Sequence, residues 1–325
     1  MRIAHERGIG KWRCRGCTMN TIGNLGNETL HRLSARLFSL CKDHGRVLVL
    51  IDRFNPIPEA LEASIKEAAL DDEERAELHD PIFGAAGQLA PQLLRLTVRH
   101  MTLLDALAGA AVQAALDPEQ PDVCVCGFLV TAVQSVRLVA AHLSRQHDPV
   151  THDGRRIFLR FQDPRVLPRL WNVLDTEQRS QLLGPVDRWV LVRRNGEIAE
   201  LQALGPKGDG RHARLSLAEH VLNGALRIEA LNLAVRSLRM GGHVVPLHED
   251  EKIDRAITQA QRTGLGTPED LAAYAALAWL WPEGLEAMKV HAQVVAGISL
   301  AQQGLPFKEY ARERLLPIIQ SDSKS

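Results

Sequence analysis

Apolar residues in the first half of the chain follow two alternating patterns. Residues 46–52, 92–98 and 123–130 are short, nearly continuous apolar runs, as expected of strands that are covered on both faces. Between them, apolar residues recur every three or four positions, which indicates helices. These helices are expected over residues 27–41, 58–70, 102–116 and from 134 to about 145. Strands that alternate with helices in this way predict an α/β fold.

A β-hairpin is expected at the end of this half. Two apolar runs, 189–194 and 197–204, flank Asn195 and Gly196. Asn-Gly between alternating runs is a strong signal for a tight hairpin turn, because both residues tolerate positive φ. We therefore expect a mixed sheet that this hairpin extends in antiparallel fashion at one edge.

From Leu215 onward the spacing of apolar residues is helical throughout, with glycines at the expected helix ends. Three parts follow from these patterns. Residues 1–26 are polar and rich in Gly and Arg, and are expected to be a disordered tail. Residues 27–206 are expected to be an α/β domain, and residues 207–325 an all-α lobe joined to it by a glycine-rich linker at 205–210.

The segment 154–165 carries the most distinctive local pattern. Its apolar residues alternate with polar ones, which predicts a strand packed on one face; they are Ile157, Leu159 and Phe161. Asp163 and Pro164 end the pattern, and a helix is expected to start there, because Asp is a good N-cap and Pro suits the first helical position.

Charged residues crowd this corner: Arg160, Asp163 and Arg165. In one interpretation, Arg160 or Arg165 pairs with Asp163 and fixes the corner structurally. In the other, the corner faces a partner or an anion. The sequence leaves both open.

Composition narrows the classes of function. The formal net charge is zero and aromatic residues make up 4% of the chain, so neither a basic field nor stacking platforms for nucleic acid are indicated. Arg155-Arg156 and Arg193-Arg194 are the only local basic pairs that could serve such a role. No apolar run is long enough to span a membrane and no signal-peptide core is present, so a cytoplasmic protein is expected.

Residues with chemical potential are scattered. Cys14 and Cys17 have the spacing of half a zinc knuckle, but no second pair follows, and the sparse, odd set of five cysteines argues against a disulfide framework. Cys124 and Cys126 are expected to share one strand face as small buried residues. The chain lacks the metal, phosphate-loop and nucleophile-elbow motifs. We therefore predict no catalytic residue, metal or cofactor.

An enzyme stays the alternative. A hydrolase could use Asp52 and Asp163, both expected at strand ends, together with a histidine from the helical lobe.

Five segments resemble a known bacterial family: Val-Leu-Val-Leu-Ile-Asp at 47–52, Phe-Leu-Val-Thr-Ala at 128–132, Val-Arg-Leu-Val-Ala-Ala-His-Leu at 136–143, the run from Asp153 to Leu167 and Leu-Gly-Pro-Val-Asp-Arg-Trp at 183–189. The most telling part is Arg160-Phe161-Gln162-Asp163-Pro164-Arg165. The family is that of the adaptor-chaperones of type VI secretion, a domain family of unknown function. The resemblance covers about residues 28–200, and the helical lobe is similar less specifically.

This resemblance implies a non-enzymatic adaptor. Such proteins bind a cognate toxic effector in the cytosol and help to load it onto the secretion spike protein. It also implies a structural or partner-binding role for Arg160, Phe161, Asp163, Pro164 and Arg165. The helical lobe is expected to contribute to effector recognition.

Overall fold

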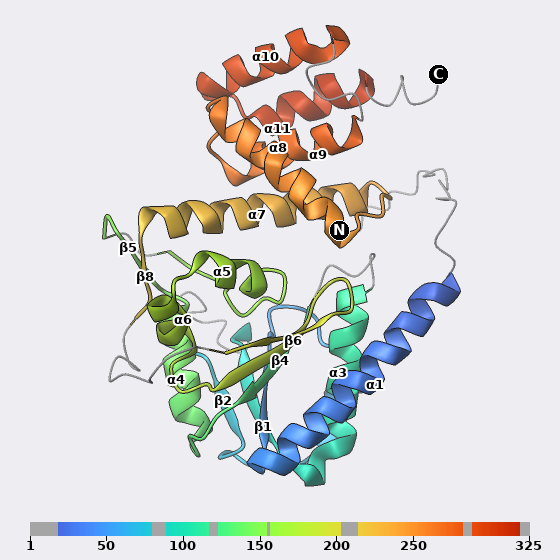
Figure 1. Ribbon diagram of the computed structural model, residues 1–325, viewed down its shortest axis with the longest axis vertical. Helices are drawn as coiled ribbons and strands as arrows, with labels where there is room; N and C mark the ends of the chain where they lie inside the picture. Colours follow the sequence, from blue (N-terminus) through green and yellow to red (C-terminus); the bar gives the residue numbers. More distant parts are fainter. Residues whose placement is uncertain are drawn as a thin grey trace, which may run out of the picture.

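The computed structural model describes residues 19–79, 89–116, 123–154, 157–202, 214–281 and 288–318. It consists of an α/β half and a helical half, which Figure 1 shows one above the other. Several predictions lie outside the described residues: the metal-like pair Cys14 and Cys17, the basic pair Arg155-Arg156 and the linker at 205–210.

A six-stranded sheet forms the centre of the α/β half. Its strands lie in the order β2-β3-β1-β4-β6-β7. Their bounds are β1 Val47–Ile51, β2 Arg75–Glu77, β3 Gln92–Leu96, β4 Val125–Val130, β6 Arg188–Val192 and β7 Ile198–Leu201. The hairpin β6-β7 lies at one edge, as the Asn195-Gly196 signal predicted.

The α/β class with a helical C-terminal region is confirmed, but the sheet is not mixed. Every neighbouring pair of its strands is antiparallel. The helix α3 (Met101–Leu116) connects β3 to β4, and these two strands run in the same direction. They are not neighbours, because β1 lies between them and runs the opposite way. The alternation of strands and helices in the sequence cannot reveal such an insertion.

Helices cover both faces of this sheet, which is why its central strands are apolar throughout (Figure 1). Alternate residues of β1 point into two different cores. Leu48 and Leu50 join the first core with α4 (Val136–Gln146), α5 (Leu167–Val173) and α6 (Thr176–Leu183). Val47, Val49 and Ile51 join the second core with α1 (Met19–His44), α2 (Glu59–Glu67) and α3.

The helical half is built around a third core. Its helices are α7 Glu219–Met240, α8 Asp250–Arg262, α9 Pro268–Leu280, α10 Met288–Gln302 and α11 Phe307–Tyr310, which continues as a π-helical turn over Ala311–Leu315. The Thr267 side chain caps α9, as expected, by accepting a hydrogen bond from the Asp270 N–H. Gly264 and Gly304 follow α8 and α10 with φ of +90° and +93°.

The helix α7 belongs to both halves of the molecule. Val221 and Ile228 lie in the first core, whereas Ala230 and the residues after it lie in the third core. Just before α7, the two-residue strand β8 (Ser216–Leu217) pairs in parallel with β5 (Val150–Thr151), and Leu217 also fills the first core. The packing of the two halves therefore divides within α7.

The predicted strand over 157–161 is wrong. These residues have no regular secondary structure. The Leu159 N–H donates to the His147 carbonyl, and the Phe161 N–H donates to the carbonyl of Leu159 itself, so the backbone bends instead of pairing with the sheet. The alternation was nevertheless informative, because Leu159 and Phe161 are buried while Phe158 is 37% exposed.

Two further expectations need correction. The helix α1 begins at Met19, so residues 19–26 of the expected disordered tail are helical, and Thr29 in this helix donates a hydrogen bond to the Gly196 carbonyl of the hairpin.

Cys124 and Cys126 do not share a strand face: they lie in the second and first cores, respectively. A bulge in β4, where Leu50 pairs with Gly127 but Ile51 pairs with Val125, shifts the alternation by one residue.

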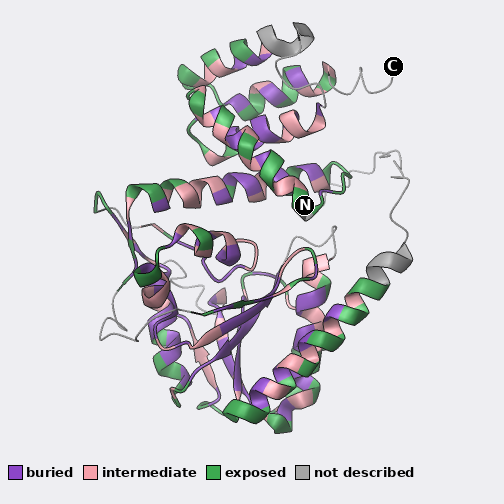
Figure 2. Ribbon diagram, in the orientation of Figure 1, coloured by how far each residue is buried: buried purple, intermediate pink, exposed green. Residues whose placement is uncertain are grey.

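In the part of the chain that the structure describes, no helix combines the length and the apolar character needed to cross a bilayer. Figure 2 shows that buried residues concentrate on the sheet and on the inner sides of the helices around it.

Candidate functional site

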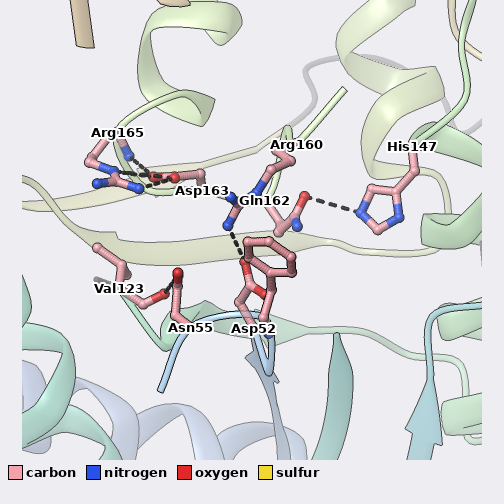
Figure 3. A network of polar contacts seen from close by, with 9 residues as sticks. Asp52, Asn55, Val123, His147, Arg160, Gln162, Asp163 and Arg165 are labelled. Atoms are coloured by element: carbon pink, nitrogen blue, oxygen red, sulfur yellow. Dashed lines mark hydrogen bonds and ion pairs between the residues drawn. The ribbon is translucent and has the colours of Figure 1, made fainter. Parts of the chain in front are cut away.

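The candidate site is the corner that follows β1 and precedes α5, which Figure 3 shows with its polar contacts. Asp52 extends from the end of β1 and is 2% exposed. Its Oδ1 accepts a hydrogen bond from the Phe54 N–H, and its Oδ2 accepts one from Arg160 Nη2 at 2.5 Å. The Arg160 guanidinium also lies 5.4 Å from the centre of the Phe54 ring. Asp52 is therefore a turn residue that is ion-paired with a residue 108 positions later in the chain.

Asp163 has its own arginine. Its carboxylate accepts hydrogen bonds from the Arg165 backbone N–H at 2.8 Å, from Nε at 2.9 Å and from Nη2 at 2.6 Å. Burial raises the pKa of Asp163, but the hydrogen bonds and charge of Arg165 outweigh it, and with the charge of Arg160 they hold this pKa below its ordinary value. Asp163 is therefore ionised at neutral pH although it is 6% exposed.

Because its carboxylate is engaged by Arg165, Asp163 does not cap α5 as predicted. The residues after it form turns, Val166 takes the N-cap position, and Pro168 rather than Pro164 lies in the first helical turn. Of the two pairings considered from the sequence, Arg165 with Asp163 is confirmed. Arg160 binds Asp52 instead.

A second polar contact lies beneath the corner. The Gln162 and His147 side chains are both fully buried, and Gln162 Oε1 lies 3.1 Å from His147 Nε2. Since an amide oxygen can only accept, the imidazole donates this hydrogen bond. The His147 ring also packs against Phe161, at 5.2 Å between ring centres. The corner is thereby attached to the end of α4.

The bulge in β4 lies on the other side of Asp52. The Asp52 N–H donates to the Cys124 carbonyl, and Asn55 Nδ2 donates to the Val123 carbonyl. Burial, and then the nearby charges of Asp52 and Asp163, raise the pKa of the Cys126 thiol well above its ordinary value. Cys126 is accordingly a neutral, inert thiol at physiological pH.

The corner is connected to the helical half through α5. The Arg165 carbonyl accepts a hydrogen bond from Arg169 Nη1 at 2.7 Å, and the same nitrogen donates to Asn232 Oδ1 on α7. Arg169 Nη2 donates to Asp250 Oδ2 at the start of α8. Arg194, in the hairpin turn, donates to the other oxygen of the same carboxylate. A continuous chain of ionic and polar contacts therefore runs from Asp163 to Asp250.

The structure shows what the residues of the hydrolase alternative contact. Both carboxylates of the hydrolase alternative, on Asp52 and Asp163, are engaged by arginines. Of the histidines in the helical lobe, His243 contacts Trp279 and His248 contacts Glu249. Across the described ranges, no group of three or more His, Cys, Asp or Glu residues is placed to hold a metal ion.

Sequence reasoning selected the motif residues but missed their partners. His147 and Arg169 carried no local signal, since each acts through a contact with a residue distant in sequence. The helix α6 was also missed, although a signal exists: Asp175 and Gln178 form a reciprocal capping box, which the spacing Asp-x-x-Gln encodes.

One comparison with known proteins gave a match. Residues 59–181, which contain most of the corner and Arg169 but not Asp52, match the model of a family described as a domain of unknown function, DUF4123. This family is associated with effectors of type VI secretion. No curated protein and no solved structure matched the chain.

Proposed function

We propose that this protein is a non-enzymatic adaptor that binds a cognate toxic effector in the bacterial cytosol and helps to load it onto the type VI secretion spike protein. The observation that carries the proposal is the match of residues 59–181 to a family associated with type VI secretion effectors. The proposal extends that association to a specific role in binding and loading.

The chemistry of the corner agrees with a binding role. A general acid or base needs a carboxylate that can exchange a proton with a substrate. Asp163 is instead held ionised by Arg165, and Asp52 is buried against Arg160. Arg193 and Arg194, the basic pair of the hairpin, are likewise paired with Glu197 and Asp250, which disfavours a role in binding phosphates.

The exposed side of the corner is the part of it that a protein partner could contact. Phe54 is 59% exposed and lies against the Arg160 guanidinium. Aromatic and Arg side chains are typical anchors of protein interfaces. Phe38, on the outer side of α1, is 50% exposed and provides a matched surface phenylalanine far from the motif in sequence.

The test is a pull-down from native cytosol with tagged protein, followed by mass spectrometry and by reconstitution of any complex from purified components. Direct binding of a protein with a toxin-like domain, alone or with a spike component, is the expected result. Retention of a small molecule or metal without a protein partner would overturn the proposal and return attention to Asp52 and Asp163. A larger loss of binding for Phe54→Ala than for Phe38→Ala would place the contact at the corner, and equal binding would place it elsewhere.

Recognition of the effector by the helical lobe is better tested by surface substitutions than by truncation. A chain that ends at residue 206 would lack Leu215, Leu217, Val221 and Ile228, all of which fill the first core. Loss of binding by such a fragment would report misfolding of the α/β half.

A further inference from the structure

The contact between the two halves contains an excess of positive charge. The Asp250 carboxylate is shared by Arg169, which binds Oδ2, and Arg194, which binds Oδ1. The three side chains are 15%, 24% and 12% exposed, respectively, so water screens them only partly. One negative charge therefore holds two positive charges at a partly buried position.

The pKa of the Arg194 guanidinium is lowered at this position. Burial lowers its pKa to about 10, and the charges of Arg239 and Arg169 act in the same direction, although Asp250 opposes them. Backbone carbonyls supply part of the missing negative potential: Arg194 donates to those of Val245 and Pro246, in the segment between α7 and α8.

The three residues join separate structural elements. Arg169 comes from α5 and Arg194 from the hairpin turn, both in the α/β half, whereas Asp250 begins α8 in the helical half. The halves are also connected by α7, which passes from the first core at Ile228 to the third core at Ala230.

We propose that Asp250, Arg169 and Arg194 form a charge-dependent latch that fixes the orientation of the helical half on the α/β half, with α7 between Ile228 and Ala230 as the hinge. Loss of the Asp250 charge does more than remove an attraction. It leaves the largely buried Arg194 guanidinium without its carboxylate and close to the positive charge of Arg239, at the end of α7 in the helical half, and separation of the halves relieves both. The proposal concerns the isolated protein and does not depend on the proposed adaptor function.

The test measures the distance between the halves. Cysteines introduced at the exposed positions Ala35 on α1 and Gln303 after α10 carry spin labels, and Ser replaces Cys14 and Cys17. Double electron–electron resonance then gives the distribution of distances between the labels. For Asp250→Asn we expect a longer mean distance and a broader distribution than for the parent chain.

The matched control is Asp254→Asn. Asp254 on α8 pairs with a single arginine, Arg227 on α7, and this pair is more exposed than the latch. Its loss leaves one arginine that water can reach, so the distance distribution is expected to stay that of the parent. Far-ultraviolet circular dichroism establishes that each variant is folded.

A double variant makes the test independent of a general loss of stability. In the Asp250→Asn background, Arg194→Gln removes the buried guanidinium that has lost its carboxylate and is expected to narrow the distribution towards that of the parent. If the substitutions only weakened the interface, the distance distribution would broaden further with the second substitution. An unchanged distribution for folded Asp250→Asn, or further broadening in the double variant, overturns the latch.

Discussion

The substitution Asp163→Ala tests whether the corner is stabilised by the pairing that the structure shows. The Asp163 carboxylate is almost completely buried and accepts hydrogen bonds from the backbone and the guanidinium of Arg165. Removing one partner of a buried ion pair typically costs about 3–5 kcal/mol, because the other charge is left uncompensated. The Arg165 side chain is 37% exposed, however, and can recover part of its hydration. We therefore expect a loss of about 2–3 kcal/mol in the free energy of unfolding, near the range of hydrogen bonds to charged groups.

Urea denaturation at neutral pH, followed by circular dichroism, measures this loss. Asp163→Asn separates the contributions, since the amide oxygen can still accept from the Arg165 N–H while the ion pair is lost, and its effect should be smaller. Asp254→Asn, which breaks an exposed pair with Arg227, should cost less than about 1 kcal/mol. A change for Asp163→Ala no larger than that of Asp254→Asn would refute the assignment of the corner as a stabilising element.

The same pair predicts a dependence on pH. The pKa of Asp163 is lowered by folding, so its contribution to stability is fully present above its ordinary value of 3.8. It is lost as the pH falls through the lower, folded-state pKa. The difference between the parent chain and Asp163→Asn should accordingly stay constant from about pH 7 down to about pH 5. A difference that shrinks within this interval would contradict the lowered pKa.

Two further predictions concern other positions. Gly184 has φ of +53°, and a Cβ there would lie 2.2 Å from the His142 ring, so Gly184→Ala should cost about 3 kcal/mol or more in urea denaturation. Gly154→Ala, with φ of +79° but nothing within 4 Å of the new Cβ, should cost only about 1–2 kcal/mol, and equal losses would contradict the clash. Burial, followed by the charge of Arg99, lowers the pKa of His100, so its unfolded form takes up a proton first and stability should fall as the pH drops below about 6.5. His100→Gln should lose less stability than the parent chain between about pH 7 and pH 5.5, and equal losses would refute this.

Much of the fold could be predicted because local signals agree with the packing. The apolar run around Val49 is a strand buried on both faces, and Asn195-Gly196 forms the expected hairpin turn. Thr267 begins a helix where its capping propensity predicts one. In each case, a property of a few consecutive residues decides the structure.

The errors occur where distant residues decide the structure. The alternation at 157–161 correctly predicts which side chains are buried, but a strand also needs a neighbour, and the backbone of Leu159 bonds to His147 instead. The bulge near Cys126 depends on the pairing of β4 with β1. Likewise, the order of strands and helices along the chain does not reveal that β1 lies between β3 and β4 and runs antiparallel to both.

The candidate site was predicted in the same partial way. The sequence identified the crowding of Arg160, Asp163 and Arg165 and the placement of Asp52 at a strand end. It could not show which arginine pairs with which carboxylate, since Asp52 and Arg160 are 108 positions apart. The connection through Arg169 to Asp250 was invisible for the same reason.

Because α7 contributes residues to both the first and the third core, its position in the chain affects how the protein folds while the ribosome synthesises it. The first core is closed by Leu215, Leu217, Val221 and Ile228, which follow its sheet in the chain. A nascent chain that has already emerged up to the hairpin thus still exposes the apolar face of α4 and α5 that these side chains cover. Domains generally fold in the order in which they are made. Here the α/β half must wait for the first turns of α7, so its core closes only after the first helix of the other half has begun to emerge.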